Sequence, residues 1–390
     1  MLEGFKSYWR QRQLPQRAKQ AMRIDHEGLQ AADPGPEAVI TASMNWLRRA
    51  QDLSRTPDGG VSRDFSLIQG WNTSYPETTG YIIPTFLQVA RLRGDDNLAV
   101  RARRMLDWFR EIQFPEGGFQ GGRIDSTPRV PVTFNTGQIL IGMAAGTQVY
   151  GETYADATRR AARWLRDSLD PDGCWRKHPT PFAAFGEKTY ETHVSWGLFE
   201  ADRVCPGEGF GAAGLRQVDW ALTKQKANGW FADCCLDDPI HPLTHTIGYA
   251  LRGILEAYRF ANDAKYLDAA QRTAQVLIGC QRADGALPGR LDANWKPAVD
   301  WSCLTGNAQV ASCWFLLARH TGDRRYHEAG ARCLSFVRRT VALEGDPDVL
   351  GGVKGAFPIE GDYGAFQFLN WSAKFTVDAC LHELGHFEEI

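Results

Sequence analysis

Long uninterrupted apolar runs are missing from this sequence of 390 residues. No segment reaches the roughly 18 apolar residues that a membrane-spanning helix needs, and the N-terminus lacks the apolar core of a signal peptide. A clustered basic excess is also missing, because the formal net charge is -2, which argues against a nucleic-acid partner. The nine cysteines are scattered, several of them within apolar helical stretches, as is typical of buried thiols in a reducing compartment. We therefore expect a cytoplasmic protein.

What the sequence does contain is a repeat. An aromatic or apolar residue that precedes a turn recurs about every 56 to 62 residues. The recurring positions are Trp46, Trp108, Trp164, Trp220, Val276 and Phe336. A polar residue and a glycine follow each one, from Asp58-Gly59 in the first copy to Lys354-Gly355 in the last. We interpret each copy as a helical hairpin.

The two helices of each expected hairpin differ in character. First helices such as ADATRRAARWLRDSL carry apolar residues at helical spacing with Arg and Asp between them, which predicts an amphipathic outer helix. Second helices such as GQILIGMAAGTQVY are small or apolar nearly all round, which predicts a buried inner helix. Six such hairpins stacked into a ring give twelve helices, an all-α (α/α)6 barrel, as one domain over residues 36–390.

Residues 1–35 form a predicted N-terminal basic arm that ends at Asp33-Pro34-Gly35-Pro36. Phe5, Tyr8 and Trp9 alternate there with lysine and arginine residues. Such an arm could contact an anionic membrane surface or a protein partner, or pack as a helix on the outside of the ring.

The turns resemble those of two known groups of proteins. Gln225, Gly229 and Trp230, and likewise Gln113, Gly117 and Phe119, are similar to the turns of the terpene-cyclase and prenyltransferase toroids. The twelve-helix count is equally similar to that of (α/α)6-barrel glycosidases, polysaccharide lyases and sugar epimerases. Segments such as YPETTGYIIPTFL and HPLTHTIGYALRG resemble bacterial proteins associated with exopolysaccharide gene clusters. The acidic motif of the triterpene cyclases and the zinc ligands of the prenyltransferases are not found, so the resemblance to isoprenoid enzymes extends to the fold only.

If the inner helices run parallel, their N-termini meet at one end of the barrel. The candidate catalytic residues Glu77, Glu191, His193 and His245 all lie at such helix starts. Any of these residues could instead be a helix cap or a satisfied core group. Converging helix N-termini also favour an anionic group on the substrate.

Aromatic and amide side chains near the same helix starts are the candidates for substrate binding, because such mixtures suit sugar rings. They are Tyr75, Asn135, Gln138, Trp175, Tyr190, Trp230, Trp301, Asn307, Asn370 and Trp371. No cofactor is expected. Cys235, His241 and His245 could be considered as metal ligands, but Pro242 separates the histidines and zinc sites usually have tighter spacing, so we expect no metal.

These residues predict a carbohydrate-active enzyme for a bacterial polysaccharide or lipid-linked oligosaccharide. Our first expectation is a glycoside hydrolase with Glu191 as acid and Glu77 as its partner, although Asp300 could replace either. A uronate lyase or C5-epimerase with His193, His245 or Tyr190 as base is the alternative. An isoprenoid enzyme and a non-catalytic glycan-binding scaffold also remain open.

Overall fold

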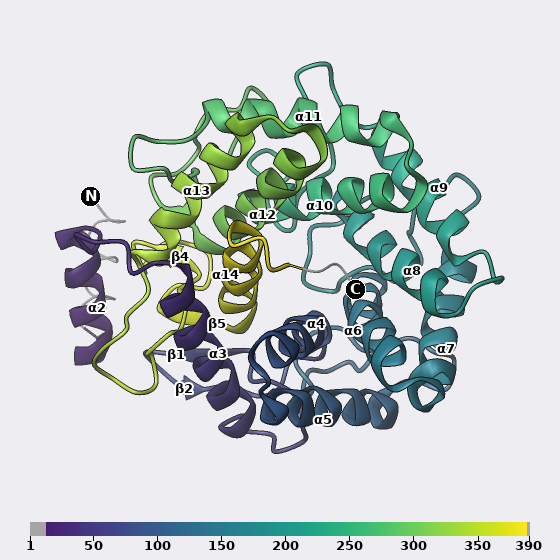
Figure 1. The fold of residues 1–390 in the computed structure, drawn as a ribbon, viewed down its shortest axis with the longest axis horizontal. Coiled ribbons are helices and arrows are strands. Elements are labelled where there is room, and N and C mark those ends of the chain that lie inside the picture. Colours follow the sequence, from purple (N-terminus) through teal and green to yellow (C-terminus); the bar gives the residue numbers. More distant parts are fainter. Residues whose placement is uncertain (1–12, 388–390) are drawn as a thin grey trace.

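The computed structural model of the protein describes residues 13–387, and its helices form two concentric rings (Figure 1). The outer ring consists of α3 (Pro36–Asp52), α5 (Asp96–Ile112), α7 (Glu152–Ser168), α9 (Phe210–Leu222), α11 (Ala264–Gly279) and α13 (Arg324–Arg338). The inner ring consists of α4 (Pro76–Arg93), α6 (Thr133–Tyr150), α8 (Thr192–Val204), α10 (Thr244–Ala261), α12 (Leu304–Thr321) and α14 (Asn370–Glu383). The predicted (α/α)6 barrel is therefore confirmed.

Burial separates the two rings as the sequence pattern requires. In α7 the buried residues, among them Tyr154, Ala161 and Leu165, lie on one face of the helix. In α6 every residue from Thr133 to Thr147 is buried. A Cβ atom on Gly142 of α6 would lie only 2.1 Å from the Gly80 carbonyl oxygen of α4, so glycine allows these inner helices to approach closely.

The turn glycine of each hairpin packs closely against the outer helix of the next hairpin. Gly117 has φ +109°, and a Cβ there would lie 2.3 Å from the Arg160 carbonyl oxygen of the next outer helix. The sixth turn was predicted wrongly at Gly355. The equivalent residue is Gly351, which has φ +75° and where a Cβ atom would lie 2.1 Å from the Ala42 carbonyl oxygen of α3. The last hairpin therefore packs on the first outer helix and closes the ring.

One small sheet strengthens this closure, and a second joins the fifth and sixth hairpins. In the first, β1 (Asp64–Ser66) pairs antiparallel with β2 (Gly70–Trp71) and with β5 (Gln367–Leu369), in the order β2-β1-β5. In the second, β3 (Ser302–Cys303) pairs with β4 (Ala356–Phe357). Since β1 follows the first outer helix and β5 precedes the last inner helix, the first sheet ties the two ends of the ring together.

The described part of the N-terminal arm packs against the barrel. Helix α2 (Gln16–Glu27) buries Asp25, which forms an ion pair with Lys354 and accepts a hydrogen bond from the Ile359 amide at 2.9 Å. Phe5, Tyr8 and Trp9, on which the predicted surface contact depends, lie outside the described residues. Within residues 13–387, no helix combines the length and the apolar composition needed to cross a membrane.

Candidate functional site

A cavity with an empty volume of about 730 Å³ lies at the end of the barrel where the inner helices begin. Its walls come from the starts of α4, α6, α10 and α14, from the 3-10 turn η1 (Thr189–Glu191) before α8, and from the connecting loops. The lining residues are Arg63, Tyr75, Glu77, Thr78, Tyr81, Phe134, Thr180, Phe182, Tyr190, Leu236, His245, Thr246, Tyr249, Tyr363 and Trp371. We call this space, the candidate active site, the catalytic cavity.

Among the described residues, Glu77 is the one carboxylate in this lining. It occupies the first turn of α4, after Pro76, and is 8% exposed. Asn135 Nδ2 donates a hydrogen bond of 3.0 Å to Glu77 Oε2, and Tyr75 also hydrogen-bonds this carboxyl. Burial raises the pKa of Glu77 to about 7, although Tyr75 and the Arg63 charge oppose the rise. Glu77 can therefore hold a proton in weakly acidic solution.

His245 lies in the same cavity and has the opposite character. Its Nδ1 donates to Gln309 Oε1 at 2.7 Å, because an amide oxygen can only accept, and this leaves Nε2 with the lone pair. Burial lowers the pKa of His245 to about 4, against the effect of the Gln309 contact. The imidazole is consequently neutral where Glu77 is still protonated.

A group of phenol rings lines the same cavity. The rings of His245 and Tyr249 are 4.3 Å apart, and those of His245 and Tyr363 are 5.3 Å apart. Burial raises the pKa of Tyr249 and of Tyr363, and the negative charge of Glu77 contributes to both shifts. Glu77 and His245 therefore face the same set of hydroxyl groups.

Arg63 is the cation of the catalytic cavity, and the sequence alone did not identify it. Its guanidinium forms an ion pair with Asp64 at 2.5 Å and lies 5.2 Å above the Trp371 ring. The Trp371 indole in turn donates to the Tyr363 hydroxyl at 2.8 Å. Arg63 comes from the loop before β1, where no motif distinguishes it, whereas Tyr249 could have been found because it lies one helical turn after His245.

His193 does not line the catalytic cavity. It is fully buried, its Nδ1 donates to Gln138 Oε1 at 2.6 Å, and its ring packs 4.5 Å from that of Tyr249. Burial and the positive charges of Arg252 and Lys374 lower its pKa well below the usual value. The expectation that His193 and His245 share one rim is therefore wrong, because Tyr249 separates His193 from the cavity.

Glu191 lies in a neighbouring cavity. It lines a space formed with Trp175 and the loop that follows Trp175, and it does not line the catalytic cavity. Burial raises its pKa to about 8, with Lys188 opposing the shift. Tyr190 and Thr180 line both cavities. The two predicted acids thus lie in adjoining spaces.

Several predicted substrate ligands hold the fold together instead. Asn307 accepts a hydrogen bond from the Leu287 amide at 2.8 Å, and Asn370 donates to the Ser62 carbonyl at 2.9 Å, so both amides fix loops. Trp230 packs on another tryptophan, Trp295, at 5.1 Å. These three residues and Trp301 are absent from the catalytic lining. Both asparagines were predicted as ligands because they are polar residues at a helix start, although these hydrogen bonds join them to the backbone of loops.

The three residues considered as metal ligands have separate partners. Cys235 Sγ lies 3.7 Å from Lys188 Nζ, and His241 Nδ1 lies 3.1 Å from Asp238 Oδ2. His245 hydrogen-bonds Gln309. Over residues 13–387, no group of three or more histidine, cysteine or acidic side chains is arranged to hold a metal ion.

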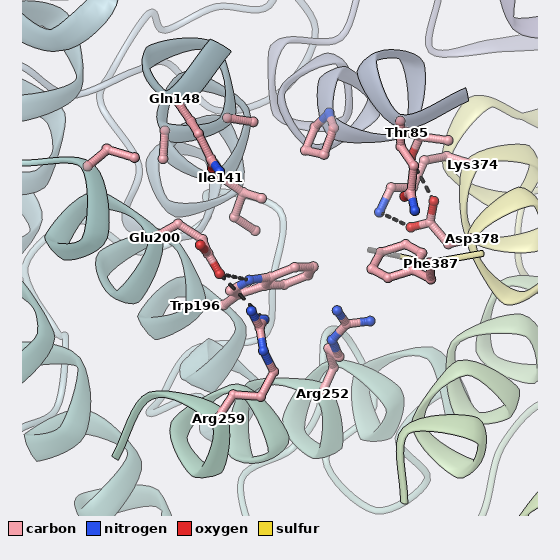
Figure 2. A pocket seen from close by; sticks show the side chains of 15 residues that line it. Thr85, Ile141, Gln148, Trp196, Glu200, Arg252, Arg259, Lys374, Asp378 and Phe387 are labelled. Atoms are coloured by element: carbon pink, nitrogen blue, oxygen red, sulfur yellow. Dashed lines mark hydrogen bonds and ion pairs between the residues drawn. The ribbon is translucent and has the colours of Figure 1, made fainter. Parts of the chain in front are cut away.

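Another cavity lies at the opposite end of the barrel, between the C-terminal halves of the inner helices (Figure 2). Its charged side chains form ion pairs with one another or with neighbouring residues. Lys374 Nζ is 2.6 Å from Asp378 Oδ2, and Arg203 Nη1 is 2.5 Å from Glu200 Oε1. Phe387, from the C-terminal segment, completes the lining. We call this the rear cavity.

Comparisons with known proteins extend the description of the fold. No protein-family model and no curated protein sequence matches the chain. Solved structures do match over nearly the whole chain. An unsaturated glucuronyl hydrolase specific for heparin is similar with a TM-score of 0.72 and 15% identity, over 91% of this chain and 98% of that one.

Two further solved structures are similar over the same extent. A D-mannose isomerase gives a TM-score of 0.73 at 12% identity, over 90% of this chain and 97% of that one. The cellobiose 2-epimerase of Bacillus thermoamylovorans gives a TM-score of 0.67 at 12% identity, over 88% and 97%. At such identities the likeness establishes the shared barrel fold.

Proposed function

We propose that the protein is a carbohydrate-active enzyme that acts on an anionic sugar by acid–base catalysis, with Glu77 as the acid and His245 as the base. One observation carries this proposal. A carboxyl group with a pKa near 7 and an imidazole with a pKa near 4 line the same cavity. Between these two values both groups are uncharged, so one can give a proton while the other takes one.

The lining supports a sugar as substrate. Tyr75, Tyr81 and Trp371 offer ring faces, and hydroxyl groups lie beside them, a combination that suits the apolar faces and the hydroxyl edges of a pyranose ring. The similar solved structures are described as enzymes of glucuronyl, mannose and cellobiose substrates.

The electrostatics support an anionic sugar. Arg63 lines the cavity, and several inner helices direct their N-termini at it, which together favour a carboxylate. Protonation of Glu77 removes the negative charge that would otherwise repel such a group. A uronate is a sugar that carries a carboxylate group, and it fits this electrostatic environment.

Among possible reactions the lining favours proton transfer at carbon. Among residues 13–387 the cavity holds a single carboxyl group, whereas hydrolysis by two carboxylates needs a pair on either side of the bond. In our proposal His245 Nε2 removes the proton from the carbon next to the uronate carboxylate, and Arg63 stabilises the enolate that forms. Glu77 then returns a proton to that carbon, giving the epimer, or to the departing glycosidic oxygen, giving an unsaturated uronate.

Glycoside hydrolysis is the second candidate. In that reaction Glu77 protonates the leaving oxygen and His245 activates the water that attacks the anomeric carbon. The protonated carboxyl at Glu77 favours it, since a raised pKa is what a glycosidase acid needs, and a glucuronyl hydrolase is among the similar structures.

Isotopes distinguish these reactions. Incubation with uronic-acid oligosaccharides in deuterated water should place deuterium on the carbon next to the carboxylate if the enzyme is an epimerase. Elimination leaves no hydrogen on that carbon and should instead produce the ultraviolet absorbance of an unsaturated uronate. Incorporation of oxygen from ¹⁸O-water at the anomeric carbon, with neither deuterium nor this absorbance, would establish hydrolysis and refute proton transfer at carbon. No product from any such sugar would refute the proposed function.

Other roles rest on the sequence alone. We propose a place in the metabolism of a bacterial polysaccharide or lipid-linked oligosaccharide in the cytoplasm, with residues 1–35 as an arm for a membrane surface or a protein, and residues 36–390 as the catalytic domain. A non-catalytic glycan-binding scaffold predicts that alanine at Glu77 and His245 leaves glycan affinity and the cellular phenotype unchanged.

A further inference from the structure

The cavity that contains Glu191 is larger than the catalytic cavity. Its empty volume is about 1230 Å³, and its wall is made mostly by the loop from Trp175 to Lys188. It adjoins the catalytic cavity, because Thr180 and Tyr190 belong to both linings. A molecule that fills the catalytic cavity and continues past Tyr190 would therefore enter this space.

The buried end of this neighbouring cavity carries polar groups that the fold leaves available. Glu191 is 5% exposed, and its Oε2 has no hydrogen-bond partner among residues 13–387. A buried polar atom without a partner is uncommon in folded proteins and is satisfied when a ligand or water supplies one. Lys188 is also buried, 3.7 Å from Cys235 Sγ. Trp175 and Tyr190 add aromatic wall beside these groups.

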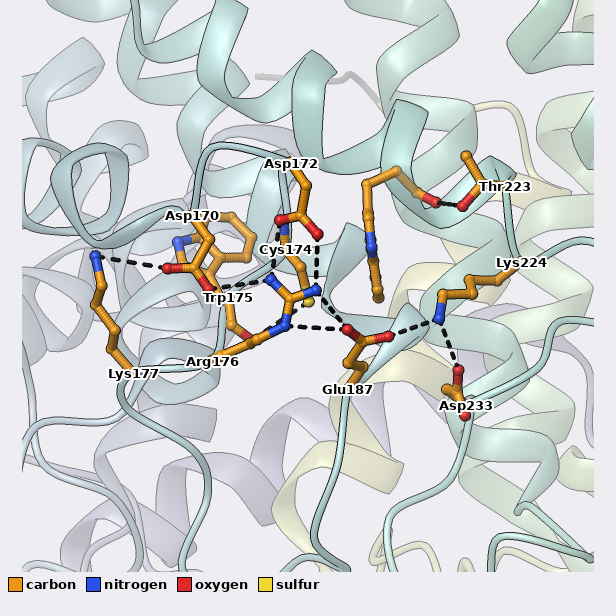
Figure 3. A network of polar contacts seen from close by, with 11 residues as sticks. Asp170, Asp172, Cys174, Trp175, Arg176, Lys177, Glu187, Thr223, Lys224 and Asp233 are labelled. Carbon is orange, nitrogen blue, oxygen red and sulfur yellow. Dashed lines mark hydrogen bonds and ion pairs between the residues drawn. The ribbon is translucent and has the colours of Figure 1, made fainter.

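The loop that covers this cavity is fixed at both ends (Figure 3). Arg176 at its start contacts Glu187 at its end at 2.5 Å, and Lys224 bonds the other oxygen of Glu187 at 2.6 Å. Arg176 also pairs with Asp172 at 2.7 Å. One such pair on a surface contributes little, but a network around a single guanidinium holds the two ends of a loop at a set distance.

The middle of the loop is tied to its neighbours as well. The Thr133 amide donates to the His178 carbonyl at 3.0 Å, and the Ala184 amide donates to the Leu236 carbonyl at 2.6 Å. The cavity is thus formed before any ligand arrives, which lowers the entropic cost of binding.

We propose that this neighbouring cavity is a second sugar subsite, which binds the unit joined to the reacting uronate, so that the substrate contains at least two sugars. Glu191, Lys188 and Tyr190 supply hydrogen bonds to its hydroxyl groups, and Trp175 and Tyr190 supply aromatic surface. This inference rests on the proposed function, because it takes the catalytic cavity as the place of the reacting sugar. The proposed role of Glu191 therefore changes from catalytic acid to substrate-binding residue.

Calorimetric titration tests the proposal. The full chain, carrying Glu77→Gln so that substrate is consumed only slowly, is titrated with glucuronic acid and with a disaccharide that ends in the same unit. We expect the disaccharide to bind at least tenfold more tightly. In Ala184→Trp, which fills the neighbouring cavity from its half-exposed loop, the ratio of the two affinities should fall to near one.

Substitutions at Glu191 sharpen the test. Glu191→Leu should reduce the affinity ratio about tenfold, and Glu191→Gln, which keeps a hydrogen-bond donor, should restore most of it. The matched control is Glu111→Leu on the exposed side of α5, which should leave both affinities unchanged.

The outcomes separate the two proposals. If neither sugar binds the protein with Glu191 and Ala184 intact, the proposed function fails. Equal binding of both sugars, or an equal loss of both affinities in Ala184→Trp, would overturn the second subsite and leave the catalytic cavity as proposed.

Discussion

The two ends of the barrel use charge in different ways. At the front, where the inner helices begin, Glu77 and His245 have pKa values moved toward their neutral forms by burial, and neither forms an ion pair with another described residue. At the rear, Arg252 Nε lies 2.6 Å from Glu256 Oε1. Although burial raises the pKa of Glu256, the charges of Arg259 and Arg252 hold it below its usual value.

This difference supports the front as the end where the proposed reaction takes place. Paired buried charges satisfy one another and fix the inner helices, whereas buried groups held neutral can exchange protons with a ligand. The rear cavity contains more charged residues, but their mutual pairing leaves fewer of them available. We therefore expect substitutions at the front to affect turnover and substitutions at the rear to affect stability.

The largest expected effect is at the front. Glu77→Gln and His245→Gln should each lower kcat by roughly 10²- to 10⁴-fold, the usual contribution of a general acid or base, while circular dichroism and Tm change little. His193→Gln is the matched control, since His193 has the same kind of glutamine partner but lies behind Tyr249. A loss at His193 as large as that at His245 would contradict the distinction between the two histidines.

The next largest effect is a loss of stability caused by a substitution at the rear end of the barrel. Glu256→Gln leaves Arg252 and Arg259 without their shared carboxylate in a fully buried place, and should reduce the free energy of unfolding by about 3 to 5 kcal/mol. Urea denaturation measures this loss. The turnover of the folded fraction should remain within a few-fold of wild type. A variant as stable as wild type, or one that is stable but inactive, would contradict the division between the two ends.

The sequence predicted the rings well and the lining of the catalytic cavity only in part. Glu77 and His245, which both line that cavity, were predicted because polar residues at buried helix starts stand out against apolar helices. Glu191 was found too, but nothing in the chain shows that Tyr190 places it in a different cavity. Arg63 and Lys188 lie on loops whose paths depend on contacts between distant segments, such as the pairing of β1 with β5. The sixth turn glycine was misplaced because Gly351 and Gly355 both lie within a glycine-rich loop, and only the contact with α3 distinguishes them.

The residues at the front end should also determine how kcat/KM depends on pH. The proposed reaction requires protonated Glu77 and neutral His245, so kcat/KM should be highest between pH values of about 4 and 7 and should fall on both sides. In Glu77→Gln the residual activity should no longer fall as the pH rises through about 7. An acidic carboxylate acting in its ionised form would give the opposite slope, with activity increasing through that pH.

Glu191 should make the stability of the protein depend on pH. The pKa of Glu191 is about 8 in the folded protein and 4.5 in its ordinary environment, so the folded state holds this proton more tightly than the unfolded state does. Stability should therefore decline as the pH rises from about 4.5 to about 8, by on the order of 5 kcal/mol from this group. Glu191→Gln cannot ionise, and its Tm relative to wild type should rise across that range and level off above pH 8. The exposed Glu111→Gln is the control for this comparison. A Tm difference that does not change with pH would mean that Glu191 is ionised in the folded protein, and the cavity beside the front site would then carry a negative charge instead of a proton donor.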